Sequence, residues 1–145
     1  MATPSALEPE PVSPGSGAPS RHRAETLFTQ GKRFYKAGNQ ARALRAFAGA
    51  VAQDPSCPEY ALYERWARFL LEPPQRADEV LVELDQLALD TIRRDKTNGF
   101  AFYVHGRVAQ ARGNLETARQ GLKTALKLDP GNLEAKTFLR ALTKR

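Results

Sequence analysis

Apolar residues recur every three or four positions through most of the chain, in runs separated by short polar breaks. Such spacing places apolar side chains on one face of a helix, and no run alternates with the two-residue period of a strand. The pattern predicts helices over residues 24–37, 40–53, 59–71, 76–93, 98–111, 115–128 and 133–144. From residue 24 onward the chain is therefore predicted to be all-α.

Glycine, asparagine and proline mark where these helices end. Gly38-Asn39 and Gly113-Asn114 each follow a helix, because both residue types tolerate the left-handed backbone of a helix end. Asp54-Pro55 and Asp129-Pro130 close two further runs, and Pro73-Pro74 closes another, since proline cannot continue a helix. Recurrence of the same stop signals indicates an internal repeat.

The spacing of these signals defines the repeat. Pro55 and Pro130 are 75 residues apart, which is two periods of 34 plus seven. The same offset relates five further pairs: Gly31 and Gly106, Gly38 and Gly113, Ala43 and Ala118, Phe47 and Leu122, Ala50 and Ala125. Of these, Gly31 and Gly106, followed by Ala43 and Ala118, are expected where the two helices of a hairpin cross closely, with Phe47 or Leu122 filling the space beside the crossing.

The motif W-x2-L-G-x2-Y, A-x3-F, P is matched by "LFTQGKRF", "ALRAF" and Pro55, and again by "FYVHGRVA", "ARQGL" and Pro130. The chain therefore resembles the tetratricopeptide repeat (TPR) family over about residues 24–145. The resemblance implies an α-α superhelix, a right-handed solenoid of three antiparallel helix pairs. Its expected parts are repeats at about 24–57, 58–98 and 99–132 and a capping helix at 133–145.

Several positions depart from the family pattern. The motif's tryptophan, leucine and tyrosine are replaced by Leu27, Gln30 and Phe34 in the first repeat, and by Phe102, His105 and Ala109 in the third. The middle repeat is degenerate, although Tyr63, Trp66 and Ala67 suit its first helix. Seven additional residues precede Asp95-Lys96, which takes the place of Asp-Pro, so a longer second helix is expected there.

Composition fits one helical domain behind a tail. The chain has 145 residues, of which 41% are hydrophobic and 8% aromatic, enough for a modest core. Residues 1–23 are rich in Pro, Ser, Gly and Ala without a periodic apolar face, so they are expected to form a disordered tail before a domain at 24–145. No apolar run could span a membrane and no secretory signal is evident, so a cytoplasmic location is expected.

The net charge of +6 is distributed in bands. Residues 21–53 carry seven basic side chains and one acid, residues 54–90 three and nine, and residues 91–145 twelve and four. Such banding argues against a uniformly polyanion-binding surface.

Motifs for chemistry are missing from the sequence. There is no P-loop, no dinucleotide glycine fingerprint and no HExxH. His22 falls in the predicted tail and His105 at a packing position, without a partner for a triad or a metal. The single Cys57 cannot form an internal disulfide, and the acids of "ADEVLVELDQLALD" fit a solvated helix face. The chain is therefore expected to be no enzyme and to hold no cofactor or metal.

The resemblance implies a partner-binding groove. In the family the second, fifth, ninth and twelfth residues of each first helix line a concave surface. Here these residues are Glu25, Phe28, Lys32 and Tyr35, and then Phe100, Tyr103, Arg107 and Gln110. Aromatic rings beside cations suit a peptide with an acidic group and an apolar anchor. The alternative is that the rings only pack against neighbouring repeats and the cations are solvated.

One specific activity of the family is not supported. Its carboxylate clamp for the C-terminal Glu-Glu-Val-Asp tails of heat-shock chaperones requires Lys at the fifth and Asn at the ninth position of the first repeat. These positions hold Phe28 and Lys32.

These observations favour a non-enzymatic adaptor or scaffold that binds a protein or peptide, similar in general arrangement to modules of bacterial proteins. One alternative is a small chaperone resembling those of type III secretion. Another is nucleic-acid binding through basic residues: Arg93, Arg94, Lys96, Lys136, Arg140, Lys144 and Arg145. No oligomeric state is indicated.

Overall fold

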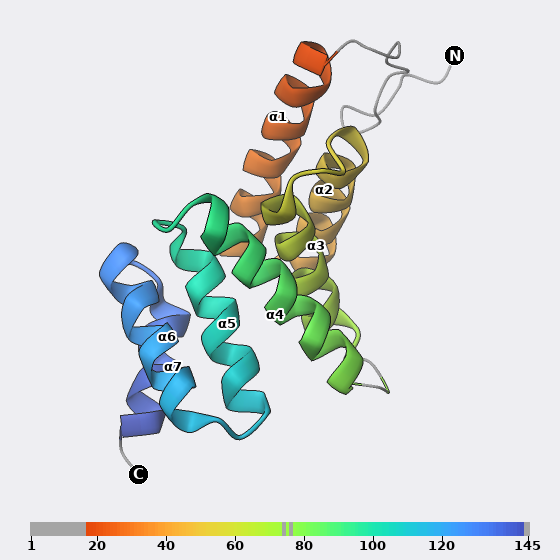
Figure 1. Cartoon of the computed structure of the whole chain (residues 1–145). Coiled ribbons are helices and arrows are strands. Elements are labelled where there is room, and N and C mark those ends of the chain that lie inside the picture. Colours follow the sequence, from red (N-terminus) through yellow and green to blue (C-terminus); the bar gives the residue numbers. More distant parts are fainter. Residues whose placement is uncertain (1–16, 74, 76, 144–145) are drawn as a thin grey trace. The chain divides into compact units, whose positions relative to one another are not determined.

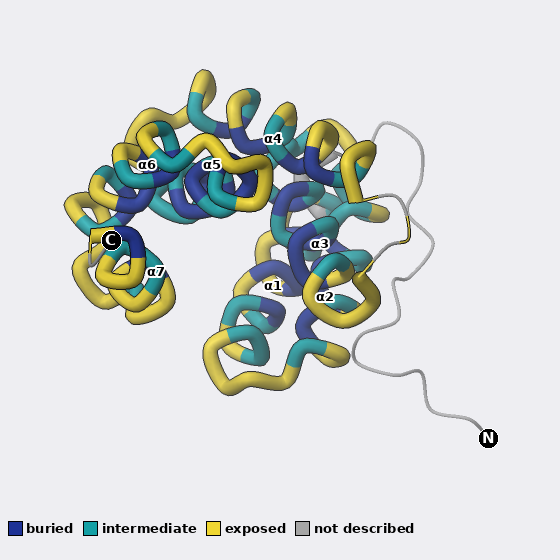
Figure 2. Tube along the Cα trace, turned by 90° about the horizontal axis from the view of Figure 1, so that it is seen from below, coloured by how far each residue is buried: buried dark blue, intermediate teal, exposed yellow. Residues whose placement is uncertain are grey.

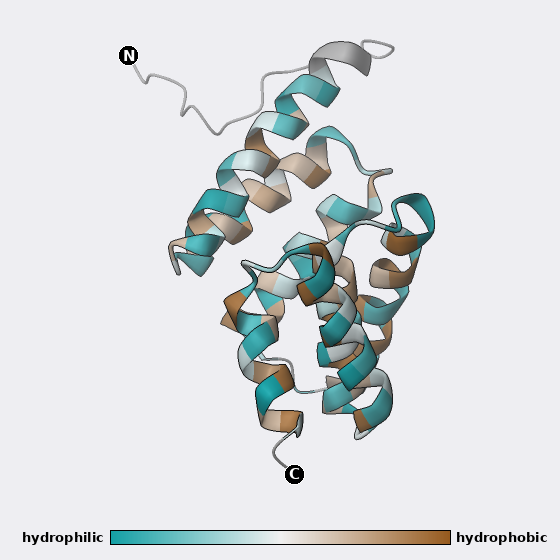
Figure 3. Ribbon diagram, turned by 90° about the vertical axis from the view of Figure 1, so that its left-hand side faces the viewer, coloured by the Kyte–Doolittle hydropathy of each residue, from teal (hydrophilic) through white to brown (hydrophobic). Residues whose placement is uncertain are grey.

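The computed structural model describes residues 17–73, 75 and 77–143. Within these residues the chain forms α-helices and no strand, which confirms the predicted all-α class. The chain divides into two compact units, Met1–Pro74 and Gln75–Arg145. Its helices carry both hydrophobic and hydrophilic residues (Figure 3), as amphipathic helices do. In the described part of the chain, no helix has both the length and the apolar character needed to cross a membrane.

The first unit contains α1 (Gly17–Lys36), α2 (Gln40–Gln53) and α3 (Pro58–Leu71). Helices α1 and α2 lie side by side, and α3 packs against α2 (Figure 1). The ring of Phe28 lies at the centre of an aromatic cluster, with its centroid 4.7 Å from that of Tyr60 and 4.8 Å from that of Tyr63. The buried residues around it are Ala24, Leu27, Ala43, Phe47, Ala50 and Ala67.

Helix α1 begins at Gly17, whereas the sequence predicts a start at Ala24. Residues 17–23, expected in the disordered tail, are thus helical. Pro19 falls in the first turn, where the N–H that proline lacks would have no intrahelical acceptor, so it does not prevent the earlier start. The remainder of the predicted tail, residues 1–16, lies outside the described residues.

The second unit contains α4 (Ala77–Arg94), α5 (Gly99–Ala111), α6 (Leu115–Leu128) and α7 (Leu133–Thr143). Helix α5 packs against both α4 and α6, and α7 packs against α6. Helix α5 therefore supplies much of the buried surface of this unit (Figure 2), through Ala101, Tyr103, Val104, Gly106, Val108 and Ala109.

The turns repeat with the spacing that the sequence predicts. Gly38 and Gly113 adopt φ angles of 81° and 82°, the left-handed conformation that glycine favours. The following asparagines cap the next helices: the side chains of Asn39 and Asn114 accept hydrogen bonds from the backbone N–H groups of Arg42 and Thr117. Both hairpins, α1–α2 and α5–α6, thus end and restart a helix in the same way.

The aspartates that close the second helices also act alike. The carboxylate of Asp54 accepts hydrogen bonds from Ser56, and that of Asp129 accepts one from the N–H of Gly131. Asp95 accepts bonds from the hydroxyl and N–H of Thr97, which lower the pKa of Asp95. Asp95 therefore takes the place of the other two aspartates, as the alignment of the middle repeat predicts.

The close crossings of the two hairpins explain their small residues. A Cβ on Gly31 would lie 2.5 Å from the ring of Phe47. A Cβ on Gly106 would lie 3.1 Å from the carbonyl oxygen of Ala118 and from the backbone nitrogen of Leu122. Glycine is therefore needed at both positions for α1 to approach α2 and α5 to approach α6.

The expected middle repeat, 58–98, contains the boundary between the two units. Helix α3 ends at Leu71, before Pro73, and belongs to the first unit, whereas α4 belongs to the second. Helix α4 has 18 residues, compared with 14 in α2 and in α6, which agrees with the longer second helix predicted from the seven additional residues.

Candidate functional site

The residues predicted to line a groove lie on the first helices of the two regular hairpins. We call Glu25, Phe28, Lys32 and Tyr35 the groove face of α1, and Phe100, Tyr103, Arg107 and Gln110 the groove face of α5. These two helices belong to different units of the chain.

On the groove face of α1, an aromatic ring supports a cation. Phe28 is buried, with 6% of its surface exposed, and it packs in the core of its unit. The ammonium of Lys32, one turn later on the helix, lies 4.7 Å from the centroid of the Phe28 ring, and Lys32 is partly exposed. The hydroxyl of Tyr35 accepts a hydrogen bond of 3.1 Å from the indole N–H of Trp66. Core packing thus fixes the rings, and Lys32 remains in reach of solvent.

On the groove face of α5, the buried Tyr103 is the corresponding aromatic residue, with 1% of its surface exposed. Its hydroxyl donates a hydrogen bond of 3.1 Å to the carboxylate of Glu134 in α7 and accepts one of 2.6 Å from Arg107. Burial raises the pKa of the Tyr103 phenol, so the hydroxyl stays protonated and keeps its donor role.

Arg107 is held by two aromatic rings. The central carbon of its guanidinium lies 5.7 Å from the ring centroid of Tyr103 and 3.5 Å from that of Phe138 in α7. Phe100 is partly buried, with its ring centroid 6.0 Å from that of Tyr103. The side-chain carbonyl oxygen of Gln110 is buried and has no hydrogen-bond partner among the described residues.

The two groove faces share the same arrangement of a cation over an aromatic ring. Lys32 and Arg107 occupy positions 75 residues apart, and each lies over an aromatic ring four residues earlier on its helix. A cation over an aromatic ring gains roughly 0.5–1 kcal/mol at a solvated site. Both units therefore present a partly exposed cation whose position is fixed by a buried ring.

Two residues of this arrangement are not indicated by the sequence alone, namely Glu134 and Phe138 of α7. They are four positions apart, as are Tyr103 and Arg107, so each pair lies on one helix face. The equal spacing of the two pairs is the one feature of the sequence that points to a contact between them. It does not by itself show that the two faces meet.

His105, expected at a packing position in place of the family's leucine, makes a polar contact between two helices. Its Nδ1 lies 2.5 Å from a carboxylate oxygen of Asp85 in α4, and both side chains are largely buried. This contact joins α5 to α4 within the second unit.

The basic residues of the nucleic-acid alternative are spread over several elements. Arg93 and Arg94 end α4, Lys96 lies in the following turn, and Lys136 and Arg140 lie on α7. The remaining two, Lys144 and Arg145, lie outside the described residues. Arg93 also forms an ion pair with Asp90.

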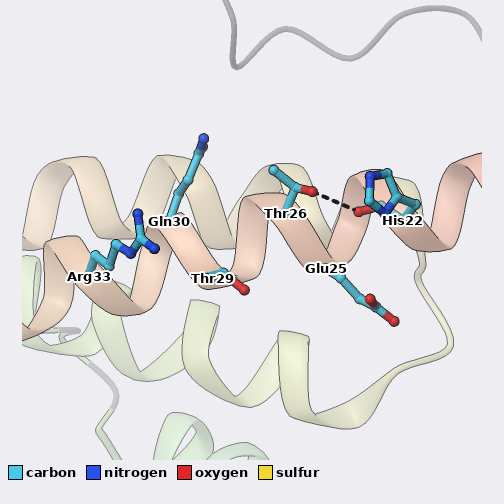
Figure 4. A pocket seen from close by; sticks show the side chains of 6 residues that line it. All are labelled: His22, Glu25, Thr26, Thr29, Gln30 and Arg33. Carbon is cyan, nitrogen blue, oxygen red and sulfur yellow. Dashed lines mark hydrogen bonds between the residues drawn. The ribbon is translucent and has the colours of Figure 1, made fainter.

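A pocket of about 320 Å³ lies along α1, lined by His22, Glu25, Thr26, Thr29, Gln30 and Arg33 (Figure 4). Within it, the hydroxyl of Thr26 donates a hydrogen bond to the carbonyl oxygen of His22. Its lining residues are all of polar or charged types, and they include Glu25 from the groove face of α1. Among the described residues, no group of three or more His, Cys, Asp or Glu side chains could hold a metal ion.

Comparison with known proteins gives the fold. No protein-family profile matches the chain, and no curated protein sequence matches it. The first TPR domain of Spaghetti (RPAP3), bound to the HSP90 peptide SRMEEVD, aligns with a TM-score of 0.57 and 21% identity over 86% of this chain and 93% of that chain. The second TPR domain of human RPAP3, in complex with the HSP70 peptide SGPTIEEVD, aligns with a TM-score of 0.54 and 24% identity over 87% and 99%.

The TPR domain of OM64 from Arabidopsis aligns with a TM-score of 0.59 and 20% identity, over 86% of this chain and 98% of that chain. The chain therefore has the fold of TPR domains. This confirms the resemblance that the repeat spacing and the glycine and proline positions predict.

Proposed function

We propose that the chain is a non-enzymatic TPR adaptor that binds acidic segments of a partner protein through the groove faces of α1 and α5. The observation that carries the proposal is the aromatic-supported cation found in both units, Lys32 over Phe28 and Arg107 over Tyr103. A carboxylate of a partner would accept charge-assisted hydrogen bonds from these cations.

The arrangement favours binding because the cations are already positioned. Ordering a long side chain on binding costs roughly 0.5–1.5 kcal/mol, and a cation held on a buried ring has lost part of that freedom before the partner arrives. Phe100, partly buried beside Tyr103, offers apolar surface next to Arg107 for an anchor residue of the partner. The proposed ligand therefore combines acidic and apolar side chains. We propose that the chain binds it in the cytoplasm.

Two of the similar domains support an acidic ligand. Both are in complex with chaperone peptides that contain two consecutive glutamates, SRMEEVD and SGPTIEEVD. We propose that this chain also binds a peptide with acidic residues, and that it does so through Lys32 and Arg107.

The heat-shock tail itself is not the proposed ligand. Phe28 stands where the carboxylate clamp of the family requires a lysine, and its ring is buried in the core. Fluorescence polarisation with labelled SRMEEVD should therefore show no saturable binding to this chain, with the first TPR domain of RPAP3 as the positive control. Saturable binding that is lost in a Lys32→Glu variant would show that a clamp forms with other residues.

A peptide selection tests the adaptor function directly. A displayed library of random peptides, selected on the purified full chain, should yield sequences that combine acidic with aliphatic or aromatic residues. Lys32→Glu or Arg107→Glu should weaken their binding by about tenfold or more, equivalent to about 1.4 kcal/mol. Arg45→Glu and Lys123→Glu are matched controls, because they make the same charge change on exposed positions of the second helices α2 and α6.

The outcome separates the groove from general electrostatics. If all four variants weaken binding equally, only the net charge matters and the groove faces are not the site. Arg107→Gln removes the charge of Arg107 but retains a hydrogen-bond donor towards Tyr103, which is bonded to α7. This variant therefore tests whether binding is weakened by the lost charge itself or by a change in the packing of α7. Selection of peptides without acidic residues would overturn the proposal.

A further inference from the structure

The outward side of α4 carries an ordered set of exposed residues: Asp78, Val82, Leu89 and Arg93, which we call the α4 stripe. Val82 and Leu89 expose 47% and 41% of their surfaces, high values for large aliphatic side chains. The intervals between the four residues are four, seven and four positions. At roughly 100° per residue, all four lie within about 60° of one another around the helix.

The fold does not require aliphatic residues at these positions. When the second helices are aligned on their closing aspartates, Val82 corresponds to Ala41 in α2 and to Glu116 in α6. Leu89 corresponds to Ala48 in α2 and Lys123 in α6. The regular hairpins thus hold small or charged side chains where the longer helix α4 exposes two large aliphatic ones, so packing within the unit does not explain them.

The stripe borders a groove within the second unit. The groove has a volume of about 190 Å³ and is lined by Val82, Asp85, Gln86, Leu89, Arg93 and Arg112. Its lining combines the aliphatic side chains of Val82 and Leu89 and the amide of Gln86 with three charged side chains, those of Asp85, Arg93 and Arg112. An exposed apolar surface with a charged rim is typical of an interface between proteins.

The stripe is complementary to itself. From the start to the end of α4, the stripe consists of an acidic residue, two aliphatic residues and a basic residue. The intervals between them, four, seven and four positions, are the same in either direction. If a second copy of α4 lies antiparallel, with a two-fold axis passing between positions 85 and 86, Val82 of one copy meets Leu89 of the other. The same axis places Asp78 opposite Arg93, twice. A two-fold interface requires this kind of self-complementarity.

We propose that the α4 stripe is a dimerisation surface, on which α4 of a second copy of this chain packs antiparallel. The ion pair of Arg93 with Asp90 is compatible with this role, because a guanidinium has five N–H donors and can bind a second carboxylate. The surface is distinct from both groove faces, so the dimer does not depend on peptide binding.

The size of the surface sets the expected affinity. One helix stripe of this length gives an interface at the small end of specific interfaces, so we expect a dissociation constant on the order of 10–100 µM. Sedimentation equilibrium of the full chain should therefore show a monomer–dimer equilibrium when its concentration is varied from about 5 to about 500 µM. A chain that stays monomeric over this range would overturn the proposal and leave the stripe to a different protein.

Replacement of the apolar residues identifies the surface. Val82→Gln and Leu89→Gln should each shift the equilibrium towards monomer by about tenfold, with an unchanged circular dichroism spectrum because both side chains are exposed. Leu133→Gln is the matched control, since Leu133 is a 72% exposed leucine of the same unit outside the stripe. Equal dimerisation of the Leu89→Gln and Leu133→Gln variants would exclude the stripe.

Exchange of charges tests the antiparallel arrangement. Arg93→Glu alone and Asp78→Lys alone each place like charges opposite one another in a homodimer, so both should weaken it. A mixture of these two variants should regain the dimer, because both contacts of the mixed pair then join opposite charges. Arg94→Glu, the same change one residue away and about 100° around the helix, should have a smaller effect than Arg93→Glu. Failure of the mixture to dimerise would exclude this arrangement.

Discussion

The guanidinium of Arg107 lies 3.5 Å from the centroid of the Phe138 ring, so a residue of the groove face of α5 also contacts the last helix of its unit. Tyr103 makes a second connection through its hydrogen bond to Glu134. The proposed binding residues of α5 and the attachment of α7 are therefore physically coupled. Any change at Arg107 acts on both, which is why stability must be measured beside binding.

Phe138→Ala should loosen α7. The substitution removes the ring that Arg107 contacts together with partly buried apolar surface, and we expect the free energy of unfolding to fall by about 1–2 kcal/mol. Urea unfolding followed by circular dichroism measures the change. Lys136→Ala, at an exposed position of the same helix, is the control and should change stability by less than about 0.5 kcal/mol. Equal changes in the two variants would mean that the contact between Phe138 and Arg107 contributes nothing to the free energy of unfolding.

Gly31→Ala and Gly49→Ala should have opposite outcomes, although both replace a helical glycine in the first unit. A Cβ on Gly31 would lie 2.5 Å from the fully buried ring of Phe47, which cannot move without disturbing the core. We expect a loss of about 1–3 kcal/mol from overpacking.

A Cβ on Gly49 meets only the flexible side chain of Leu27, whose nearest atom lies 3.1 Å away. Alanine gains up to about 1 kcal/mol over glycine in a helix, so this variant should be neutral or more stable. Urea midpoints of both variants provide the comparison. A stable Gly31→Ala variant would contradict the close crossing of α1 and α2.

Cys57→Ser should stabilise the start of α3. Cys57 is the N-cap residue of this helix but makes no side-chain capping bond, whereas the side chain of Asn98 caps α5. Burial raises the pKa of the Cys57 thiol, which stays protonated, and a thiol sulfur is a weak acceptor. A serine hydroxyl of similar size is a stronger acceptor for the backbone N–H groups at the start of the helix.

The measurement compares Cys57→Ser with Cys57→Ala, because both remove the thiol and only one can cap. Serine should exceed alanine by about 1 kcal/mol in the free energy of unfolding, the usual difference between a capping and a non-capping residue. If the two variants are equally stable, the backbone at this helix start is satisfied in another way.

The sequence predicts the helices well because their signals are local. Apolar periodicity and the Gly-Asn and Asp turns place α2 and α6 at the observed residues. The other observed bounds lie within one residue of the predicted ones, except for the start of α1. Composition alone predicts a tail over residues 17–23, because Pro19 counts against a helix unless its place in the first turn is known.

The site is less predictable because its contacts are not local. The family pattern assigns Phe28 to a groove, but whether its ring is free or buried depends on Tyr60 and Tyr63 of another helix. The hydrogen bond from Tyr103 to Glu134 joins residues 31 positions apart. The roles of these residues in binding remain predictions, and their positions come from packing that spacing along one helix does not specify.

Tyr60 should make the stability of the chain sensitive to alkaline pH. It is buried, with 8% of its surface exposed, and burial raises the pKa of its phenol from 10.0 to about 12. Below pH 10 the phenol is protonated in both the folded and the unfolded chain, so its contribution to stability is fully present. Above pH 10 the unfolded chain loses this proton first, and the contribution is lost progressively until the folded phenol ionises near pH 12.

Comparison with Tyr60→Phe isolates this effect from other alkaline titrations. Wild type should lose about 1 kcal/mol more than the variant between pH 9 and pH 11, a difference that urea unfolding at the two pH values measures. The ultraviolet absorbance of tyrosinate in the native chain should, in parallel, lose a component that ionises near pH 12 when Tyr60 is replaced. Equal losses in both proteins would show that the Tyr60 phenol ionises near its ordinary pKa and is therefore in contact with water.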